Sequence, residues 1–286
     1  MNKFSLTTDI ISSKKNKNDI NIIHISDIHF NINTKDTFLS RLYDYIKKQN
    51  PDYTMITGDL LDTPKIVKDN KINELLSFLK KIANVAPLLI SIGNHDIIME
   101  DDFIFFDELN KIKNVFVLNN ESYEDDNIFV FGLTLPNNYY YNVTWQEPVK
   151  ILLDVLNRQS NKWKKEYSKP AILLVHSPIR LTNSDVLNVI KPFDLVLSGH
   201  THNGMVPKWL YPLFPKNMGI VSPIEKLFPK IAKGKIIEEI NNKKITIIIN
   251  GAITKLSKQS GKILSRLNFL YNSSVNKIII KKEGKK

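Results

Sequence analysis

Short apolar runs alternate with amphipathic segments along most of this chain, and that alternation restricts its fold more than any other feature. Buried strands are predicted at INIIHIS (20–26), YTMIT (53–57), PLLISIG (87–93), AILLVH (171–176) and FDLVLSG (193–199). Further strands are predicted at 114–118, 128–135, 245–249 and 276–281, and helices at 36–49, about 66–83, about 103–111 and about 147–166. Strands that alternate with helices predict an α/β fold whose sheet is covered on both faces.

Two segments depart from this alternation. Residues 1–20 are polar and rich in Lys and Asn, so we expect an arm or irregular lead-in before a single domain over 21–286. Residues 205–230 contain five prolines, which exclude a long helix, yet Trp209, Leu213 and Phe214 make the segment too apolar for a simple linker. The segment either caps the fold and buries its own aromatics, or presents an apolar surface rimmed by Lys208, Lys216, Lys226 and Lys230.

Composition limits the classes of partner and of metal ligand. The formal net charge of +11 predicts attraction to phosphorylated substrates, nucleic acid or anionic membrane surfaces, without choosing among them. The chain has no cysteine, so disulfides and thiolate ligands are excluded. It also has no apolar stretch of 18 residues and no apolar core of a secretory signal near Met1, so a cytoplasmic location is expected.

Polar motifs follow five of the predicted strands. They are DIH (27–29), GDLLD (58–62), GNHD (93–96), VHSP (175–178) and GHTH (199–202). Ligand sites of open α/β sheets lie outside the carboxyl ends of the strands, so the five motifs are predicted to converge. Five of the six histidines belong to them, and the sixth, His24, is interpreted as a packing or hydrogen-bonding residue within a strand. Asp27 and His29, two residues apart, are expected to point to the same side as the first strand ends.

The side chains in these motifs form an oxygen and nitrogen ligand set. Asp, Asn and His without Cys suit manganese, iron, zinc or cobalt. Seven such ligands are too many for one tetrahedral ion, whereas two ions that share a carboxylate would use them all. Two ions about 3.5–4 Å apart can hold a bridging hydroxide and clamp a phosphoryl oxygen, which is the arrangement used in phosphate-ester hydrolysis.

The ordered motifs closely resemble those of the calcineurin-like metallophosphoesterase family, D-x-H, G-D-x-x-D, G-N-H-D/E, H and G-H-x-H, over residues 27–202. The resemblance implies a two-sheet α/β sandwich with helices on the outer faces and two divalent metal ions, most often manganese, iron or zinc. It implies that one metal is bound by Asp27, His29 and His202, that the other is bound by Asn94, His176 and His200, and that Asp59 bridges them.

The resemblance also implies catalytic roles for two further residues. His95 is similar to the residue that contacts phosphate and helps the leaving oxygen depart, and Asp62 to the carboxylate that orients this histidine. Asp96 is expected to support the ligands or to cap a helix. Gly58, Gly93 and Gly199 are expected where the backbone takes unusual dihedrals or approaches the metals closely.

The substrate is less constrained than the metal site. DLVLSGHTHNG followed by an apolar Pro-rich segment resembles a bacterial branch with phosphodiesterases and UDP-diacylglucosamine pyrophosphatases, although HNGM stands where that branch has Gly-Gly-Gln. A phosphodiesterase or pyrophosphatase acting on a lipid-linked or nucleotide-linked phosphate ester is therefore expected, with peripheral binding to an anionic membrane as one reading of 205–230. The alternatives are a metal-dependent nuclease and, against the complete ligand set, a non-catalytic scaffold.

Overall fold

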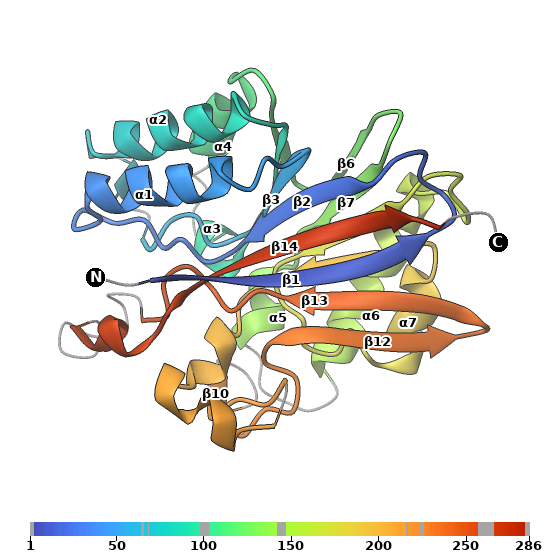
Figure 1. Cartoon of the computed structure of the whole chain (residues 1–286). Coiled ribbons are helices and arrows are strands. Elements are labelled where there is room, and N and C mark those ends of the chain that lie inside the picture. The colour runs from blue at the N-terminus through green and yellow to red at the C-terminus, as the bar shows by residue number, and fades with distance from the viewer. Residues whose placement is uncertain are drawn as a thin grey trace.

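The computed structural model describes residues 3–283 apart from 64–65, 68, 98–102, 142–146, 216, 223–225 and 257–265. Two six-stranded sheets pack face to face, and helices cover the outer face of each (Figure 1). The expected two-sheet α/β sandwich with helices on its outer faces is confirmed.

The first sheet has the strand order β1-β14-β2-β3-β4-β5. Its strands are β1 (Phe4–Ser13), β2 (Ile20–Ile25), β3 (Tyr53–Thr57), β4 (Leu88–Ser91), β5 (Val115–Leu118) and β14 (Ser273–Lys282). The strands β2 to β5 run parallel, whereas β14 is antiparallel to β2 and parallel to β1. The carboxyl ends of β2, β3 and β4 therefore meet at one edge of the sheet.

The second sheet also has six strands, in the order β12-β13-β9-β8-β7-β6. Its strands are β6 (Glu121–Glu124), β7 (Phe129–Leu133), β8 (Ala171–Val175), β9 (Leu195–Ser198), β12 (Gly234–Ile240) and β13 (Lys243–Ile249). Its four central strands are parallel, and β6 and β12 are antiparallel at the edges.

Three apolar layers hold the sandwich together. The first sheet packs against α1 (Asp36–Lys47), α2 (Ile72–Ala83) and α4 (Phe103–Asn110), and the second against α5 (Asn137–Tyr141), α6 (Glu147–Gln159) and α7 (Ser184–Ile190). Between the sheets lies a third core that includes Ile22, Met55, Val130, Leu174 and Leu197. In β2 the alternation is visible directly, because Ile22 faces this inner core while Ile23 and Ile25 face the helices.

Several predicted boundaries are wrong, and one predicted arm is a strand. Residues 4–13 pair with β14 over ten positions, so they are not an irregular lead-in. Most of their polar residues are accommodated because β1 lies at the sheet edge, where every side chain except that of Asp9 is partly buried or exposed. The helix predicted from about 66 begins at Ile72, and the one predicted to reach 166 ends at Gln159. The edge strands β6 and β12 were not predicted.

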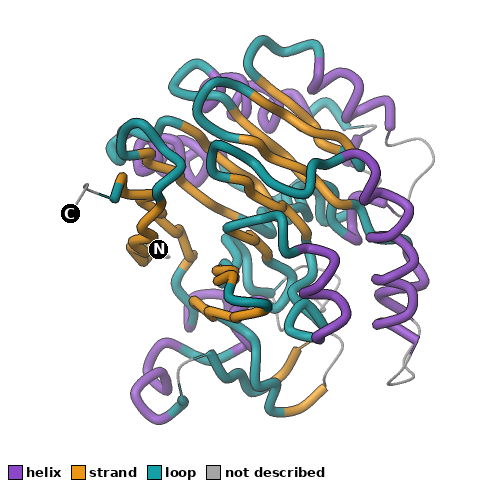
Figure 2. Tube along the Cα trace, turned by 90° about the vertical axis from the view of Figure 1, so that its right-hand side faces the viewer, coloured by secondary structure: helices purple, strands orange, loops and turns teal. Residues whose placement is uncertain are grey.

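The Pro-rich segment lies below the sheets in Figures 1 and 2. As expected, it holds no long helix in its described part, which consists of short elements: 3-10 turns η4 (His202–Met205) and η5 (Lys208–Leu213), β10 (Val221–Ser222) and β11 (Lys226–Leu227). Val206 is buried, but Trp209 is 65% and Leu213 76% exposed. The segment therefore buries some of its apolar side chains and leaves others exposed. Lys216 and the side chain of Lys226 lie outside the described residues.

Candidate metal centre

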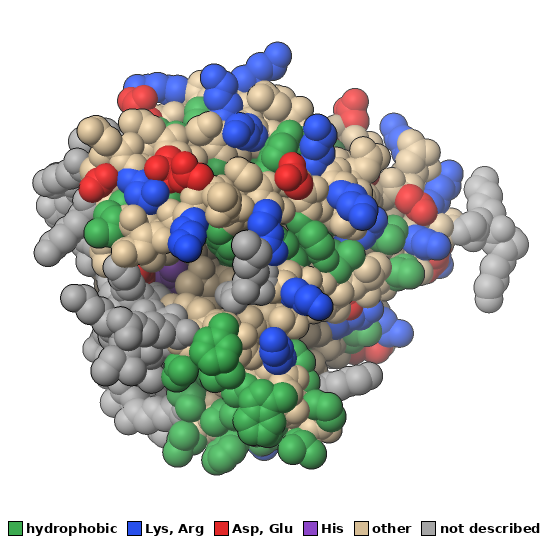
Figure 3. Space-filling model, turned by 60° about the vertical axis from the view of Figure 1, so that its left-hand side comes forward, with side chains coloured by type: hydrophobic (Ala, Val, Ile, Leu, Met, Phe, Trp, Pro, Cys, Tyr) green, Lys and Arg blue, Asp and Glu red, His purple; other side chains and the backbone are tan. Residues whose placement is uncertain are grey.

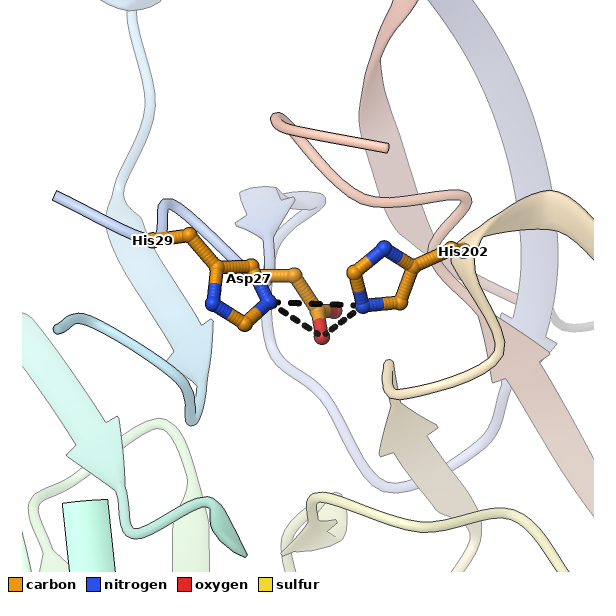
Figure 4. A group of neighbouring side chains, drawn as sticks. All are labelled: Asp27, His29 and His202. Carbon is orange, nitrogen blue, oxygen red and sulfur yellow. Dashed lines mark hydrogen bonds and ion pairs between the residues drawn. The ribbon is translucent and has the colours of Figure 1, made fainter. Parts of the chain in front are cut away.

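All five polar motifs meet where the two sheets face each other at their carboxyl ends. The first sheet supplies Asp27, His29, Asp59 and Asn94 after β2, β3 and β4, and the second supplies His176, His200 and His202 after β8 and β9. Three residues, Asp27, His29 and His202, form one group whose possible ligand atoms lie within 4.8 Å of one another (Figure 4). A second such group contains Asp59, His176 and His200. Asn94 joins it, with Oδ1 3.1 Å from His176 Nε2.

Left-handed backbone conformations, and not strand geometry, aim these side chains. The strand β2 ends at Ile25, before Asp27 and His29, whose φ angles are 54° and 48°. Strand alternation is therefore the wrong reason for their proximity. Asp59, His200 and His202 also have positive φ. Non-glycine residues rarely adopt this conformation, and its concentration at one place is typical of functional sites.

The two oxygens of the Asp27 carboxylate have different surroundings: one is hydrogen-bonded to the protein and the other faces the centre. Its Oδ2 accepts hydrogen bonds from the Ser26 hydroxyl and from the His200 main-chain N–H. Its Oδ1 is buried, lies 3.2 Å from His202 Nε2 and 3.8 Å from His29 Nε2, and has no hydrogen-bond partner among the described residues. A buried carboxylate oxygen facing imidazole nitrogens without a hydrogen bond is in the position expected of a metal ligand.

The two oxygens of the Asp59 carboxylate differ in the same way. Its Oδ1 accepts a hydrogen bond of 2.8 Å from the main-chain N–H of His95. Its Oδ2 lies 3.6 Å from His29 Nε2 and 3.2 Å from His176 Nε2. These two histidines belong to different groups, so a single oxygen of Asp59 lies between them.

Main-chain carbonyls determine which imidazole nitrogens face the centre. His176 Nδ1 lies 2.7 Å from the Thr57 carbonyl, and His202 Nδ1 lies 2.6 Å from the Lys255 carbonyl. Carbonyl oxygens only accept, so each Nδ1 donates its proton and each Nε2 is the nitrogen that faces the centre. His202 Nε2 meets His29 Nε2 at 3.3 Å, and His176 Nε2 meets Asn94 Oδ1 at 3.1 Å. A metal ion placed between the two atoms of either pair would be within reach of both.

The pKa values of the site residues are also consistent with a bound cation. Burial alone would raise the pKa of Asp27 and of Asp59, yet the facing imidazoles hold both below their ordinary values. Burial would also lower the pKa of His176, but the Asp59 carboxylate raises it to about 10. Burial lowers the pKa of His29 and His200 to about 3. The two carboxylates therefore favour a positive charge at the centre, which a bound metal ion would supply.

His95 lies beside the centre with its ring partly accessible. Its Nδ1 is 3.0 Å from the main-chain carbonyl of Asp62, which fixes the tautomer and leaves Nε2 available. The prediction gave this orienting role to the Asp62 carboxylate. In the structure that carboxylate instead lies 3.3 Å from Asn31 Nδ2 and 3.7 Å from His29 Nδ1, so the orienting contact with His95 comes from the main chain.

Asp96 supports the loop that carries Asp59. Its carboxylate accepts main-chain N–H groups from Asp59, Leu60, Leu61 and Gly93, at 2.8–3.3 Å. Asp96 is itself buried. Of its two expected roles, support of the ligands is the one that these contacts show.

We expect Asp96→Ala to destabilise the protein by about 3 kcal/mol or more and to lower its metal content, because buried N–H groups lose their acceptor. Asp96→Asn keeps one carbonyl oxygen and should fall between Ala and wild type. Thermal unfolding and metal analysis would measure both effects. The exposed Asp126→Ala is the matched control and should change stability by no more than about 0.5 kcal/mol. Equal stabilities for Asp96→Ala and Asp126→Ala would contradict the supporting role.

Two glycines are required by close packing at the centre. A Cβ on Gly199 would lie 1.7 Å from Ser26 Oγ and 2.5 Å from Asp27 Oδ2, and one on Gly93 would lie 2.2 Å from Asp59 Oδ1. A larger residue at either position would displace a candidate ligand. His24, as expected, is a buried strand residue whose Nε2 lies 2.8 Å from Thr57 Oγ1.

The loop after β13 supports the centre from behind, although no sequence motif marks it. The main-chain N–H groups of Ile253 and Thr254 donate to the carbonyls of Ser26 and Asp27, and the Lys255 carbonyl holds His202. Asn250 ties the same loop to His24 and Asn276. Most of these contacts use main-chain atoms, which leave no residue signature. Only the polar residues that follow the apolar β13 could have signalled the loop.

The comparisons with known proteins agree with this geometry. Residues 20–204 match the calcineurin-like phosphoesterase family, and the chain belongs to it. An uncharacterized metallophosphoesterase of Campylobacter jejuni, Cj0846, is 30% identical over 68% of this chain and 47% of its own length. A metallophosphoesterase of Helicobacter pylori is 27% identical over 70% and 48%. The chain thus spans about half the length of these two relatives.

One relative carries a named activity. The UDP-2,3-diacylglucosamine pyrophosphatase LpxG of Chlamydia muridarum is 24% identical over 71% of this chain and 71% of its own length. The family that matches is one of metal-dependent phosphoester hydrolases. The clustered Asp and His side chains fit the two-metal centre of that family.

Proposed function

We propose that this protein hydrolyses a phosphodiester or pyrophosphate bond in a lipid-linked or nucleotide-linked substrate, using two divalent metal ions. Asp27, His29 and His202 would hold one ion, and Asn94, His176 and His200 the other. The observation that carries the proposal is Asp59 Oδ2, which faces His29 of the first group and His176 of the second. Two ions so placed would supply Lewis-acid chemistry, polarising the phosphoryl group and activating the attacking water.

The chain's own residues would handle the leaving group. His95 Nδ1 is held by the Asp62 carbonyl, so its Nε2 is the atom that can give a proton to the leaving oxygen. Burial opposes the charged form of His95, but the Asp59 carboxylate and the Asp62 carbonyl raise its pKa above the ordinary value. A protonated His95 beside the centre would also attract the negative phosphoryl group before reaction.

A substrate panel tests the proposed function. Purified protein with added manganese is assayed on a nitrophenyl monoester, a bis-nitrophenyl diester, cyclic nucleotides, UDP-diacylglucosamine and single-stranded DNA. Turnover of the diester and of the nucleotide-linked lipid, above that of the monoester, is expected. DNA cleavage at a higher kcat/KM than either would favour the nuclease instead. Absence of turnover on the whole panel with manganese, iron or zinc would overturn the proposal.

Peripheral contact with an anionic membrane is a further part of the proposal. No helix in the described residues is long and apolar enough to cross a membrane. Figure 3 shows an apolar surface on the Pro-rich segment, with basic side chains beside it, below a hollow in which histidine is visible. Trp209, Leu213, Leu227 and Phe228, each more than half exposed, belong to that segment, and Lys208 is also exposed there. Apolar side chains among lysines suit a lipid surface.

We expect replacement of Trp209, Leu213 and Phe214 by Ser to weaken binding to anionic liposomes and to slow hydrolysis of a lipid-linked phosphate. Hydrolysis of a small soluble diester should stay near wild type, because the candidate ligands and His95 are unaltered. Sedimentation with liposomes measures the binding, which should also fall with added salt because lysine charges are screened over about 8–10 Å. Ile237→Ser, at an exposed position on β12, is the control. Wild-type protein that ignores anionic liposomes at low salt would exclude membrane contact.

A further inference from the structure

A cavity of about 1060 Å³ has no role in the metal site described above. One wall is the outward face of α6, with Val149, Lys150 and Leu153, and another is the loop after β8, residues 178–183. The third wall is the end of the Pro-rich segment, residues 227–231. The volume is slightly above the range of small-molecule sites, roughly 300–1,000 Å³.

Two walls of this cavity are connected to candidate metal ligands, one through the chain and the other through a hydrogen bond. Pro178 follows His176 by two residues, so their Cα atoms lie within about 8 Å of each other. On the opposite wall, Ile231 precedes Ala232, whose carbonyl accepts a 2.7 Å hydrogen bond from Thr201. Thr201 lies between His200 and His202 in the chain. The cavity therefore adjoins the side of the centre formed by the second sheet.

The lining combines apolar surface with positive charge. Val149, Leu153 and Ile231 are joined by Leu227 and Phe228 from the exposed apolar surface. Lys150, Arg180 and Lys230 also line the cavity, and among the described lining residues Asp154 supplies one carboxylate against them. Apolar walls with an excess of cations suit a ligand that has both an apolar body and an anionic group.

Backbone strain marks two of the lining residues. Arg180 has a φ of 66° and Phe228 a φ of 51°, although neither is glycine. Phe228 is held in this conformation by a 2.8 Å hydrogen bond from its N–H to the Ile220 carbonyl, and Ile220 in turn donates to Gly204, next to the metal centre. Strained residues persist only where the surroundings hold them, and they cluster at ligand clamps as well as at active sites.

We propose that this cavity binds the acyl chain and a second anionic group of a lipid-linked substrate while its scissile phosphate lies at the metal centre. The inference rests on the proposed hydrolytic function and narrows its substrate to a lipid-linked phosphate ester. A flexible chain fits better than a nucleobase, because Phe228 is the one aromatic ring among the described lining residues and the other apolar contacts are aliphatic. The apolar lining also continues into the exposed surface at Leu227 and Phe228, which gives a long chain an exit.

Binding of dodecylphosphonate, which cannot be hydrolysed, tests the cavity without relying on turnover. Calorimetry on the metal-loaded protein, below the micelle concentration, should show at least tenfold tighter binding than methylphosphonate, which shares only the anionic group. Binding of 12-phosphonododecanoate, which adds a second anionic group at the far end of the chain, should weaken several-fold in each of the charge reversals Lys150→Glu and Lys230→Glu, both at exposed positions. Leu153→Asp should weaken it tenfold or more. Lys244→Glu, a charge reversal on β13, is the matched control and should leave it unchanged.

Each outcome decides the question. Equal affinity for the two phosphonates, or equal losses in Lys244→Glu and the cavity variants, would overturn the inference. If Leu153→Asp does not fold, the two exposed lysine variants still decide it. The proposed function is judged separately: a protein that hydrolyses the bis-nitrophenyl diester but binds both phosphonates alike keeps its function and loses the lipid cavity. A protein that binds dodecylphosphonate tightly but hydrolyses nothing on the substrate panel loses the function.

Discussion

Asp59→Asn is expected to abolish hydrolysis and to lower the metal content from two ions toward one or none. Asp59 Oδ2 lies between His29 and His176, so it is the oxygen placed to serve both ions. Asparagine is nearly the same size but lacks the negative charge that two neighbouring cations need. Metal analysis by mass spectrometry and turnover of a nitrophenyl diester measure the two effects.

The fold should survive this substitution. The amide oxygen of an asparagine at this position can still accept the hydrogen bond from the His95 main chain, and the three apolar cores are untouched. Circular dichroism would check this, and the exposed Asp126→Asn would serve as the isosteric control. An Asp59→Asn protein that holds two metals and turns over at the wild-type rate would exclude the bridging assignment.

His95→Ala has the second largest expected effect. Both metals should stay bound, while turnover falls by roughly 10²–10⁴-fold, the scale for loss of a general acid. The reason is positional: the ring is held through Nδ1 by the Asp62 carbonyl, which leaves Nε2 for the leaving oxygen. Since His95 Nδ1 contacts main-chain atoms, Asp62→Asn should preserve that contact and lose less activity than His95→Ala.

The leaving group separates two explanations of such a loss. Nitrophenolate departs without a proton, so the defect of His95→Ala should shrink on nitrophenyl esters and remain large on alkyl esters. Equal defects on both would argue that His95 only attracts the phosphoryl group. Loss of a metal ion in the His95→Ala protein would instead identify His95 as a metal ligand. This outcome must be checked because His95, His29 and Asp59 also form a group whose possible ligand atoms lie close together.

Much of the architecture was predictable because the signals were local. Central strands such as β3 and β8 are continuous apolar runs, and both were located within one residue of their observed ends. The edge strands were missed for the opposite reason: β1 and β12 carry polar residues on their exposed positions, and their pairing partners lie far away in the chain or across a turn. Strand pairing with distant residues leaves little trace in composition.

The candidate site was likewise predictable only in part. The side chains that face the centre could be located from motif order, whereas their aim could not. Asp27 and His29 depend on left-handed conformations that the surrounding loops impose. The hold on His202 by Lys255 and on His95 by Asp62 comes through carbonyl oxygens, which every residue type possesses. Main-chain support of this kind is visible only once the fold is known.

The position of β14 controls when the first sheet can be completed. This strand lies between β1 and β2, and among the described strands β1 pairs with β14 alone. During synthesis, β1 must therefore wait until residues 273–282 have left the ribosome, and β2 keeps an open edge until then. The loop that braces Asp27 and His202 immediately follows β13, so it too arrives late. A nascent chain would thus contain its candidate metal ligands before the loop that positions Asp27 and His202 had been synthesised.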